Sequence, residues 1–455
     1  LAGSAPLGFT AMVLAVLVPP LPEFTASPAH GVAPLTVEFT NDSTGDYSDS
    51  VWAFGDGVTS TLGSPTHTYH DPNVYTVTLT VSGLAGTETL TRSNYITAYQ
   101  RVQAKFAANL TSGIAPLTVN FTNESTGDYN TCTWDFGDGE SSTICISPTH
   151  EYVSSGTYTV TLTVSGLGGT DTVTHSSYVT AYESVVADFT ASPTCGIAPL
   201  EVSFTNLSTG NYDAIRWSFG DGVTSTRESP THTYGMAGVY SVTLTVSGLG
   251  GTDALTLADL VTAHQAVKAG FTASPTAGLA PLMVAFANTS SGDFTVSVWD
   301  FGDGFTSTQT SPTHTYASPG VFTVALTASG PGGTDVLTDT NYITAYEEVE
   351  ADFTVSPTLG IAPVTSVFTN TSTGDYTDAL WDFGDGATST LGSPTHTYGL
   401  PGAYAVTLAV TGPGGTDTVI CENCVTVYDP TRAGFSASPT EGIAPLMVDF
   451  ENLST

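Results

Sequence analysis

Short runs of alternating apolar and polar residues recur along the chain. In residues 157–164, TYTVTLTV, the apolar side chains of Tyr158, Val160, Leu162 and Val164 alternate with threonine. Because successive side chains of a strand point to opposite faces, this pattern predicts a strand buried on one face. A helical period is found nowhere in the sequence. The pattern predicts about seven short strands in about 80 residues, as in an all-β, immunoglobulin-like sandwich.

The strand pattern belongs to a sequence repeat of 82 or 83 residues. Its most regular motif is WDFGDG at 134–139, and close relatives stand at 52–57, 217–222, 299–304 and 381–386. A repeat of this kind predicts a tandem array of five complete domains and the beginning of a sixth. The expected parts are an apolar N-terminal segment at 1–20, domains at 21–100, 101–183, 184–265, 266–347 and 348–429, and an incomplete domain at 430–455.

The WDFGDG motif indicates a structural role for its residues. Trp134 and Phe136 lie two positions apart, so both point into the sandwich, while Asp135 points outward. The Gly-Asp-Gly tip supplies residues that tolerate positive φ and an aspartate that can cap the turn, as a tight hairpin requires. We therefore interpret this aspartate as a turn residue rather than a cation ligand. The tryptophans expected in the five cores are Trp52, Trp134, Trp217, Trp299 and Trp381.

The motifs that follow extend this pattern. W-D-F-G-D-G precedes P-T-H-x-Y, G-x-Y-x-V-x-L-x-V and G-G-T-D, and together they resemble the PKD domain over roughly residues 22–455. The resemblance implies β-sandwiches that serve as spacers or interaction modules on cell surfaces, including archaeal surface-layer proteins and secreted bacterial hydrolases. It also implies no catalysis in this fold. Ala53 and Ser218 replace the aspartate after tryptophan, so this outward aspartate is dispensable.

Charge narrows the range of partners. Only 11% of the residues are charged, yet 42 acidic residues face 7 basic ones, which gives a net charge of −35. Such a surface repels phosphate backbones and anionic lipids, and this argues against nucleic acids and membranes as electrostatic partners. A cation or a basic partner remains attractive. Serine, threonine, asparagine and glycine supply the polar surface, as in secreted β-proteins.

The five cysteines are too few for a disulfide scaffold and form no zinc pattern with the nine histidines. Cys132 and Cys145 flank the Gly-Asp-Gly turn almost symmetrically, which predicts a disulfide across the hairpin. Cys421 and Cys424 lie in one short break of a strand. We expect a local disulfide there rather than a redox motif, which would need a helix start. Cys195 is left free or available for a bond to another chain.

Seven Asn-x-Ser/Thr sequons are present, and six of them fall at one position of the repeat, just after its second strand. Asn-x-Ser-Thr-Gly is also good turn chemistry, so two interpretations stay open at this position: turn residues or surface glycosylation acceptors. The sequon asparagines are Asn41, Asn109, Asn123, Asn206, Asn288, Asn370 and Asn452.

Catalysis requires groups that converge, and the repeat keeps its histidines apart. One histidine recurs at the same position of each domain, about 82 residues from the next, so each of these is expected to pack or to cap a turn. A serine nucleophile elbow, a phosphate loop and an HExxH motif are all missing from the sequence, which predicts that the protein is no enzyme. The histidines are His67, His150, His232, His314 and His396.

The junctions between domains offer a better candidate site. Only about six residues separate Tyr346 from Phe353, so neighbouring domains are expected nearly to touch and to form an extended, stiff rod. Carboxylates on flexible loops at this junction would suit calcium, with a plain solvated acidic face as the alternative. The calcium candidates are Glu348, Glu350, Asp352, Asp375 and Asp417.

The two ends of the sequence do not fit the repeat. Residues 1–18 carry no charge, form no intact signal peptide and are marginal as a membrane span. The stretch from Phe435 onward contains two strands of a sandwich and would expose an apolar edge. Either the true chain continues, or the N-terminal segment of one subunit adds a strand to the incomplete domain of the next. Residues 11–16 resemble the strand at 405–410, which favours strand addition.

These observations predict an extracellular filament or cell-surface rod subunit that assembles head to tail with copies of itself. The N-terminal segment would serve as strand donor or as an anchor. The alternative is a spacer or adhesin stalk of a larger secreted protein, with a surface carbohydrate or a protein as its ligand.

Overall fold

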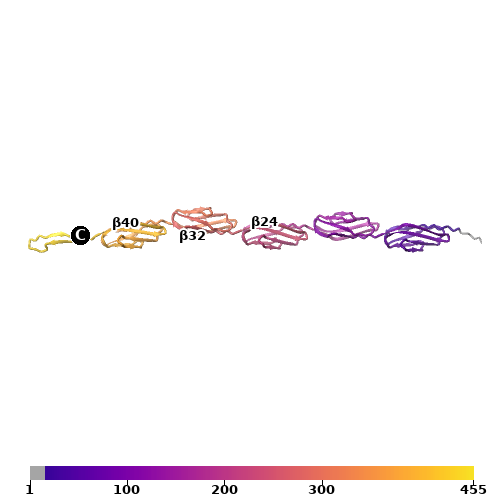
Figure 1. Cartoon of the computed structure of the whole chain (residues 1–455), viewed down its shortest axis with the longest axis horizontal. Helices are drawn as coiled ribbons and strands as arrows, with labels where there is room; N and C mark the ends of the chain where they lie inside the picture. The colour runs from indigo at the N-terminus through magenta and orange to yellow at the C-terminus, as the bar shows by residue number, and fades with distance from the viewer. Residues whose placement is uncertain (1–15) are drawn as a thin grey trace, which may run out of the picture. The chain divides into compact units, whose positions relative to one another are not determined.

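Each of the five complete repeats forms a sandwich of a three-stranded and a five-stranded sheet (Figure 1). The structure is a computed structural model that describes residues 16–455, and no helix occurs among these residues. The prediction of an all-β fold of tandem immunoglobulin-like sandwiches is therefore confirmed. Within the described part of the chain, a search for helices long and apolar enough to cross a membrane found none.

Every complete repeat contains eight strands in the same order. The first repeat has β1 (Phe24–Ser27), β2 (His30–Val32), β3 (Leu35–Asn41), β4 (Asp49–Ala53), β5 (Thr59–Ser60), β6 (Thr66–Tyr69), β7 (Asn73–Gly83) and β8 (Gly86–Tyr99). The second has β9 (Phe106–Ala108), β10 (Ser112–Ile114), β11 (Leu117–Asn123), β12 (Thr131–Asp135), β13 (Ser141–Ser142), β14 (Thr149–Tyr152), β15 (Gly156–Gly166) and β16 (Gly169–Tyr182). The third has β17 (Phe189–Ser192), β18 (Cys195–Ile197), β19 (Leu200–Asn206), β20 (Ala214–Ser218), β21 (Thr224–Ser225), β22 (Thr231–Tyr234), β23 (Gly238–Gly248) and β24 (Gly251–His264).

The last two complete repeats follow the same scheme. The fourth has β25 (Phe271–Ser274), β26 (Ala277–Leu279), β27 (Leu282–Asn288), β28 (Val296–Asp300), β29 (Thr306–Ser307), β30 (Thr313–Tyr316), β31 (Gly320–Gly330) and β32 (Gly333–Tyr346). The fifth has β33 (Phe353–Ser356), β34 (Leu359–Ile361), β35 (Val364–Asn370), β36 (Asp378–Asp382), β37 (Thr388–Ser389), β38 (Thr395–Tyr398), β39 (Gly402–Gly412) and β40 (Gly415–Tyr428).

The second repeat illustrates how the strands are arranged. Its sheets have the orders β14–β11–β9 and β10–β16–β15–β12–β13. Neighbouring strands are antiparallel except β10, which pairs in parallel with β16 so that Ser112 lies opposite Thr180. The alternating pattern predicted the long strands but not this parallel one, because three residues around Gly113 carry no alternation. Each repeat thus has eight strands instead of the predicted seven, and the Gly-Asp-Gly turn lies between the fourth and fifth of them.

The aromatic residues of the motif form the core of each sandwich, as predicted. The ring centre of Trp134 lies 5.3 Å from that of Phe106 and 5.6 Å from that of Phe121. The indole Nε1 donates a hydrogen bond of 3.0 Å to the carbonyl of Ile144, which satisfies the polar edge of a buried ring. All five tryptophans are fully buried: Trp52, Trp134, Trp217, Trp299 and Trp381.

The residues in front of the first strand of each repeat belong to the domain that follows. In the second repeat, the N–H of Gln100 donates to Oδ2 of Asp128 at 2.6 Å, and Gln103 forms a β-bridge with Thr126. Val102 and Ala104 are buried in the core of the same domain. We call these segments the leading straps; they comprise residues 18–23, 100–105, 183–188, 265–270 and 347–352.

The boundary between two neighbouring repeats falls between two adjacent residues, as their backbone hydrogen bonds show. The carbonyl of Tyr99 accepts from Ala33 in the first repeat, whereas the next residue, Gln100, is bonded in the second. Backbone groups divide in the same way between residues 182 and 183, 264 and 265, and 346 and 347, while Nδ1 of His264 also lies 3.2 Å from Oδ2 of Asp293 in the fourth repeat. These boundaries lie one residue earlier than predicted, and the residues expected to link two domains are structured parts of the second domain.

The leading strap of the first repeat begins inside the predicted apolar segment. The N–H of Val18 donates to Oδ2 of Asp46 at 2.8 Å, so residues 18–20 belong to the first domain. The rest of the strand-donor or anchor prediction falls on residues 1–15, outside the described residues.

The sixth repeat is represented by a two-stranded hairpin of β41 (Phe435–Ser438) and β42 (Asp449–Asn452). Phe435 pairs with Asn452 in the register that Phe24 and Asn41 adopt in the first repeat. Phe435 and Phe450 are each 71% exposed, whereas Phe24 is fully buried. Among the described residues, nothing covers this apolar face.

Candidate functional site

The Gly-Asp-Gly turn is held by its own aspartate. In the second repeat, Oδ1 of Asp138 accepts a hydrogen bond of 3.1 Å from the N–H of Glu140. Gly137 adopts a φ of 83°, and a Cβ on it would collide with the carbonyl of Thr159. This geometry confirms that the aspartate is a turn residue. The same bond is made by Asp56, Asp303 and Asp385.

The second oxygen of this carboxylate binds the histidine of the repeat. Nε2 of His150 lies 2.7 Å from Oδ2 of Asp138, and the imidazole stacks on Phe136 with ring centres 4.1 Å apart. Asp138 belongs to a turn of the five-stranded sheet and His150 to β14 of the three-stranded sheet, so the pair ties the two sheets together. The corresponding pairs are Asp56–His67, Asp303–His314 and Asp385–His396, at 2.6 or 2.7 Å.

The sequence analysis expected these histidines to pack or to cap a turn and did not foresee the pairing. The available signal was a nearly constant spacing between aspartate and histidine, 11 residues in the first repeat and 12 in the second. Burial works to raise the pKa of Asp385, but hydrogen bonds from His396 and from the Ala387 amide outweigh it and hold the pKa below its usual value. The carboxylate therefore stays ionised and acts as an acceptor for both partners.

The carboxylates predicted to bind calcium lie on or beside the leading strap of the fifth repeat. Oδ2 of Asp375 accepts from the N–H of Glu347 at 2.8 Å, and Oδ2 of Asp417 accepts from the N–H of Ala351 at 2.7 Å. Bonds from backbone amides, that of Ala351 first, lower the pKa of Asp417. The bond to the strap recurs between Asp171 and Ala104, Asp253 and Ala187, and Asp335 and Ala269.

The other three candidates share this region. Asp352 accepts from the Phe353 amide and from the hydroxyl of Thr371, while Glu350 forms the β-bridge that continues the strap. A search of residues 16–455 for three or more clustered His, Cys, Asp or Glu side chains able to hold a metal ion returns none. The carboxylates of Asp375 and Asp417 hold the strap in place. Calcium binding at Glu348 and its neighbours stays a prediction.

The structure joins both predicted cysteine pairs. The Cα atoms of Cys132 and Cys145 are 5.2 Å apart, and those of Cys421 and Cys424 are 5.3 Å apart. Cys195, in β18, is exposed and unbonded in the described chain. Cys424 of the second disulfide is buried in the core of the fifth repeat, and Cys421 and Phe353 both pack against that core.

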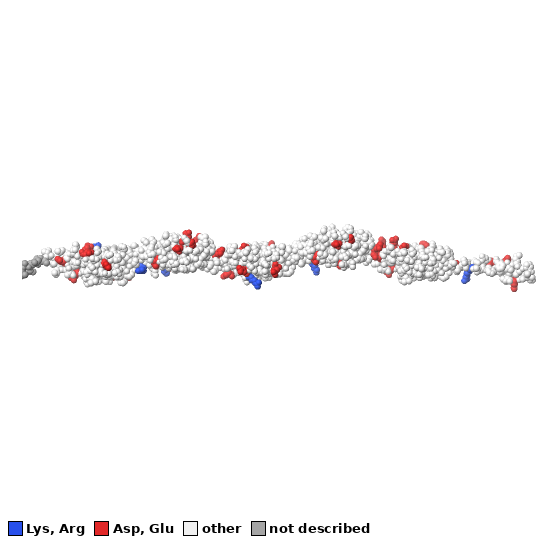
Figure 2. Space-filling view, turned by 180° about the vertical axis from the view of Figure 1, so that it is seen from behind, with Lys and Arg blue, Asp and Glu red and all other residues white. Residues whose placement is uncertain are grey.

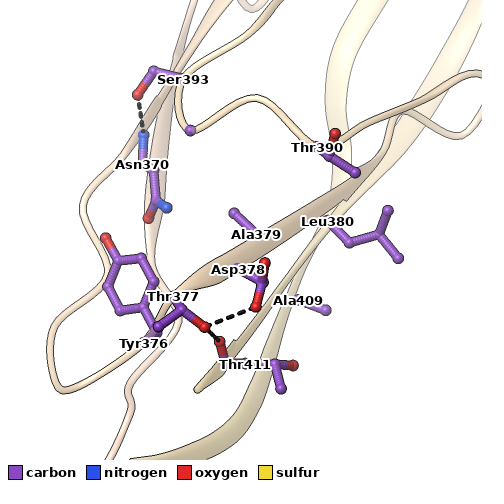
Figure 3. A pocket seen from close by; sticks show the side chains of 11 residues that line it. Asn370, Tyr376, Thr377, Asp378, Ala379, Leu380, Thr390, Ser393, Ala409 and Thr411 are labelled. Atoms are coloured by element: carbon purple, nitrogen blue, oxygen red, sulfur yellow. Dashed lines mark hydrogen bonds between the residues drawn. The ribbon is translucent and has the colours of Figure 1, made fainter. Parts of the chain in front are cut away.

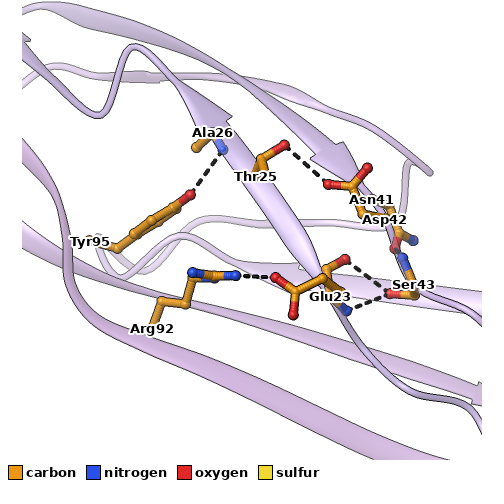
Figure 4. A network of polar contacts seen from close by, with 8 residues as sticks. All are labelled: Glu23, Thr25, Ala26, Asn41, Asp42, Ser43, Arg92 and Tyr95. Carbon is orange, nitrogen blue, oxygen red and sulfur yellow. Dashed lines mark hydrogen bonds and ion pairs between the residues drawn. The ribbon is translucent and has the colours of Figure 1, made fainter.

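In the first repeat, the position of Cys421 is occupied by a positively charged side chain, that of Arg92. The guanidinium of Arg92 lies 5.1 Å from the ring centre of Phe24 and pairs with Glu23 of the leading strap (Figure 4). The hydroxyl of Tyr95 accepts from the Ala26 amide at 3.1 Å, which fixes the neighbouring strand (Figure 4). The residue at the position of Arg92 is His175, Asp339 or Cys421 in three other repeats.

Six of the seven sequon asparagines begin a turn. Their Oδ1 atoms accept from the amide two residues later at 2.9–3.0 Å. In three repeats Nδ2 also donates within the domain, from Asn123 to the Cys145 carbonyl, from Asn206 to Tyr212, and from Asn288 to Ser297. Both roles stay open at these positions, because Nδ2 carries two hydrogens and one hydrogen bond leaves the other available. Glycosylation at all seven asparagines stays a prediction.

A groove opens beside Asn41 at the edge of the first sandwich and beside Asn370 at the edge of the fifth. In the fifth repeat it has a volume of about 530 Å³ and lies between Asn370, Tyr376, Asp378 and the loop at Gly392 (Figure 3). The first repeat has a matching groove of about 620 Å³, lined by Asn41, Tyr47, Asp49 and Gly63 among others. We call this feature the edge groove. Sequence analysis missed it; the small residues at positions 63 and 392 were the signal.

Comparison with characterised proteins found similarity over short stretches. The chain is 55% identical over 42 residues to a microbial collagenase of Vibrio alginolyticus, which covers 9% of this chain and 5% of that protein. It is 45% identical over 58 residues to collagenase ColA of Bacillus cereus, covering 12% and 6%. It is 44% identical over 52 residues to the pre-pro-metalloprotease PrtV of Vibrio cholerae, covering 11% and 6%. The chain thus matches about a twentieth of the length of these relatives.

Solved structures with tandem immunoglobulin domains align with the chain. The I67–I69 fragment of titin is 12% identical, with a TM-score of 0.42, 56% coverage of this chain and 99% of that one. Immunoglobulin domains 1–5 of Sidekick-1 are 12% identical, with a TM-score of 0.27, 91% coverage of this chain and 100% of that one. The sequence profile of the PKD domain matches residues 18–98, 101–181, 185–263, 262–345 and 350–427. The chain therefore belongs to the PKD domain family and carries five copies in tandem.

Proposed function

We propose that this chain is a non-catalytic structural part of a secreted or cell-surface protein, in which the PKD domains form a semi-rigid spacer. One observation carries the proposal: in the described chain, no unbonded residue stands between two consecutive complete repeats. Tyr99 is bonded to Ala33 on one side of the first junction, and Gln100 is bonded to Asp128 on the other.

This arrangement limits the motion that a junction can permit. The reach and freedom of a linker grow with its number of free residues, and these junctions have none. One domain can turn relative to the next only by rotation about the backbone bonds between these two residues, because each residue is held by its own domain. The four junctions between complete repeats share this pattern, which supports the proposed spacer.

An extracellular location agrees with the chemistry of the chain. Two disulfides favour an oxidising compartment. Acidic side chains are spread over the repeats on the face seen in Figure 2, and basic ones are few. A surface of one charge sign keeps such domains soluble and apart.

Small-angle X-ray scattering of the purified chain tests the spacer. The matched variants insert the same Gly-Ser hexapeptide after residues 99, 182, 264 and 346, or, as a control, in the exposed loops between the sixth and seventh strands of four repeats. We expect the junction insertions to reduce the radius of gyration and the control insertions to leave it near that of the parent. A parent as compact as the junction variant would overturn the proposal.

A second candidate function is head-to-tail assembly, favoured by the exposed apolar face of the β41–β42 hairpin. In a complete repeat this face is covered by the five-stranded sheet, and a strand from the segment 1–20 of a second copy would cover part of it. Electron microscopy of the chain with and without residues 1–17 tests this idea and leaves the leading strap of the first domain intact. Filaments that disappear on deletion are expected. Single particles in both samples would leave the spacer as the function.

A further inference from the structure

We propose that the edge groove of the first and fifth repeats binds a neutral, hydroxyl-rich saccharide. Every residue that lines the groove of the first repeat has a counterpart lining that of the fifth. A groove that recurs at one place in two domains follows from local sequence rather than from the accident of one loop. The inference is independent of the spacer proposal, since each groove lies within a single domain.

A glycine at one position leaves the groove open. Gly63 and Gly392 each follow the residue whose carbonyl accepts the bond from the core tryptophan. A Cβ on either would meet no atom within 4 Å, so a side chain placed there has room to enter the groove. The corresponding residues of the second, third and fourth repeats are larger: Cys145, Glu228 and Thr310.

The two grooved repeats also present a free donor. Oδ1 of Asn370 accepts from the Ser372 amide at 2.9 Å, which fixes the orientation of the side-chain amide. Its Nδ2 and that of Asn41 have no hydrogen-bond partner within residues 16–455, in contrast to the three asparagines of the middle repeats. In Figure 3 the side chain of Asn370 points into the groove beside Tyr376.

The remaining groups complete a site for a sugar. Asp378 offers a carboxylate whose Oδ2 is oriented by a bond of 2.7 Å from Thr377, and Asp49 is held in the same way by Ser48 at 2.8 Å. A sugar ring carries donors and acceptors on its edge and C–H groups on its face. An amide donor, a carboxylate acceptor and the ring of Tyr376 match these groups.

Charge and size narrow the ligand further. The groove carboxylate and the net charge of −35 disfavour phosphorylated, sulfated or acidic sugars, which leaves neutral ones. Volumes of about 530 and 620 Å³ fall within the range of small-molecule sites. Both grooves open at the domain edge, which suits a short, weakly bound saccharide or the end of a longer one.

Saturation-transfer NMR on the whole chain, produced in a host that adds no glycans, tests the proposal. The probes are cellobiose, maltose and N,N′-diacetylchitobiose, each used alone at millimolar concentration. We expect transfer to at least one of them and its loss in the double variant Gly63→Trp with Gly392→Trp. The matched control is Gly399→Trp, which also has open space for a side chain but lies outside the groove; it should retain transfer.

A second variant keeps the test decisive if the tryptophans disturb folding, which circular dichroism would reveal. Asp49→Asn with Asp378→Asn preserves shape and should weaken binding by about tenfold. The proposal fails if none of the three sugars shows transfer, or if transfer survives the groove variants. It also fails if tetra-alanine binds in the groove instead. The proposal also fails if the protein from its natural source carries a covalent glycan on Asn41 or Asn370, because the groove would then hold an attached sugar and not a free ligand.

Discussion

At the scale of single residues, one carboxylate in each domain connects elements that lie on different sheets. Oδ1 of Asp385 closes its own turn through the Ala387 amide, and Oδ2 holds His396 of the three-stranded sheet. The imidazole in turn stacks on Phe383, with ring centres 4.2 Å apart. The aspartate therefore supports both the hairpin and the packing of the two sheets.

We predict that Asp385→Asn destabilises the fifth repeat and removes part of its acid sensitivity. The folded pKa of Asp385 lies below the ordinary value of 3.8, so its contribution is present above that pH and is lost as the pH falls through the lower folded pKa. The substitution should cost about 1 kcal/mol at pH 7 and flatten the decline in stability below pH 4. Urea unfolding of the fragment 347–428 measures this, since Trp381 is its only tryptophan.

The exposed Glu422→Gln provides the control for this prediction, because it removes a carboxylate from the same domain without touching the turn. It should leave both the midpoint and the pH profile near those of the parent fragment. An equal effect of the two substitutions would mean that general charge, and not the aspartate–histidine pair, sets the acid sensitivity.

At the scale of elements, the leading strap joins two loops of its own domain. In the second repeat, Asp171 near the start of β16 accepts from the N–H of Ala104 at 2.8 Å, and Asp128 of the turn before β12 holds Gln100. The strap thus depends on carboxylates that reach it from two different loops. Burial of Val102 and Ala104 beneath these bonds gives the strap its hydrophobic contribution.

We predict that Asp171→Ala loosens the strap without unfolding the second domain. One hydrogen bond to a charged acceptor is lost, which should cost about 1.5–3 kcal/mol locally. Hydrogen–deuterium exchange should then be faster in peptides that cover residues 100–105. The control is Glu151→Ala, an exposed carboxylate on β14 of the same domain. Unchanged exchange in the strap after Asp171→Ala would contradict its role as an anchor.

The two disulfides are predicted to contribute unequally to stability. They close loops of 13 and 3 residues, and the entropy removed from an unfolded chain grows with loop length. Replacing Cys132 and Cys145 by serine should cost about 3 kcal/mol, and replacing Cys421 and Cys424 about 1.5 kcal/mol. Urea unfolding of the fragments 100–182 and 347–428 compares them, and equal losses would refute the loop-length argument.

Some strands of the repeat could be predicted from the sequence, and others could not. Strands such as β15 could be predicted because Tyr158, Val160, Leu162 and Val164 alternate with threonine over a long run. The parallel strand β10 could not, since its three residues gain their place from pairing with β16. The aspartate–histidine pair and the edge groove depend on residues that meet only after two sheets pack, so local periodicity carried no sign of them.

At the scale of the whole molecule, the position of the boundaries decides what one domain is. Hydrogen bonds inside the second repeat begin at Gln100 and end at the Tyr182 carbonyl, which accepts from Ala115. The repeat therefore completes its backbone bonding without a neighbour. The motif-based boundary at 101 would remove the first of these bonds, because the motifs begin only at the opening phenylalanine and carry no information about the strap.

We predict that the fragment 100–182 folds alone and that the fragment 106–182 is much less stable. The shorter fragment lacks the bonds of Gln100 and Gln103 and exposes the core against which Val102 and Ala104 pack. A loss of about 2–4 kcal/mol follows from these bonds and this buried surface, which corresponds to a fall of at least about 10 °C in the melting temperature of a domain this small. Differential scanning calorimetry of both fragments measures it. Equal melting temperatures would mean that residues 100–105 add nothing to the domain and act as a linker. The argument for a spacer with tight junctions would then fail.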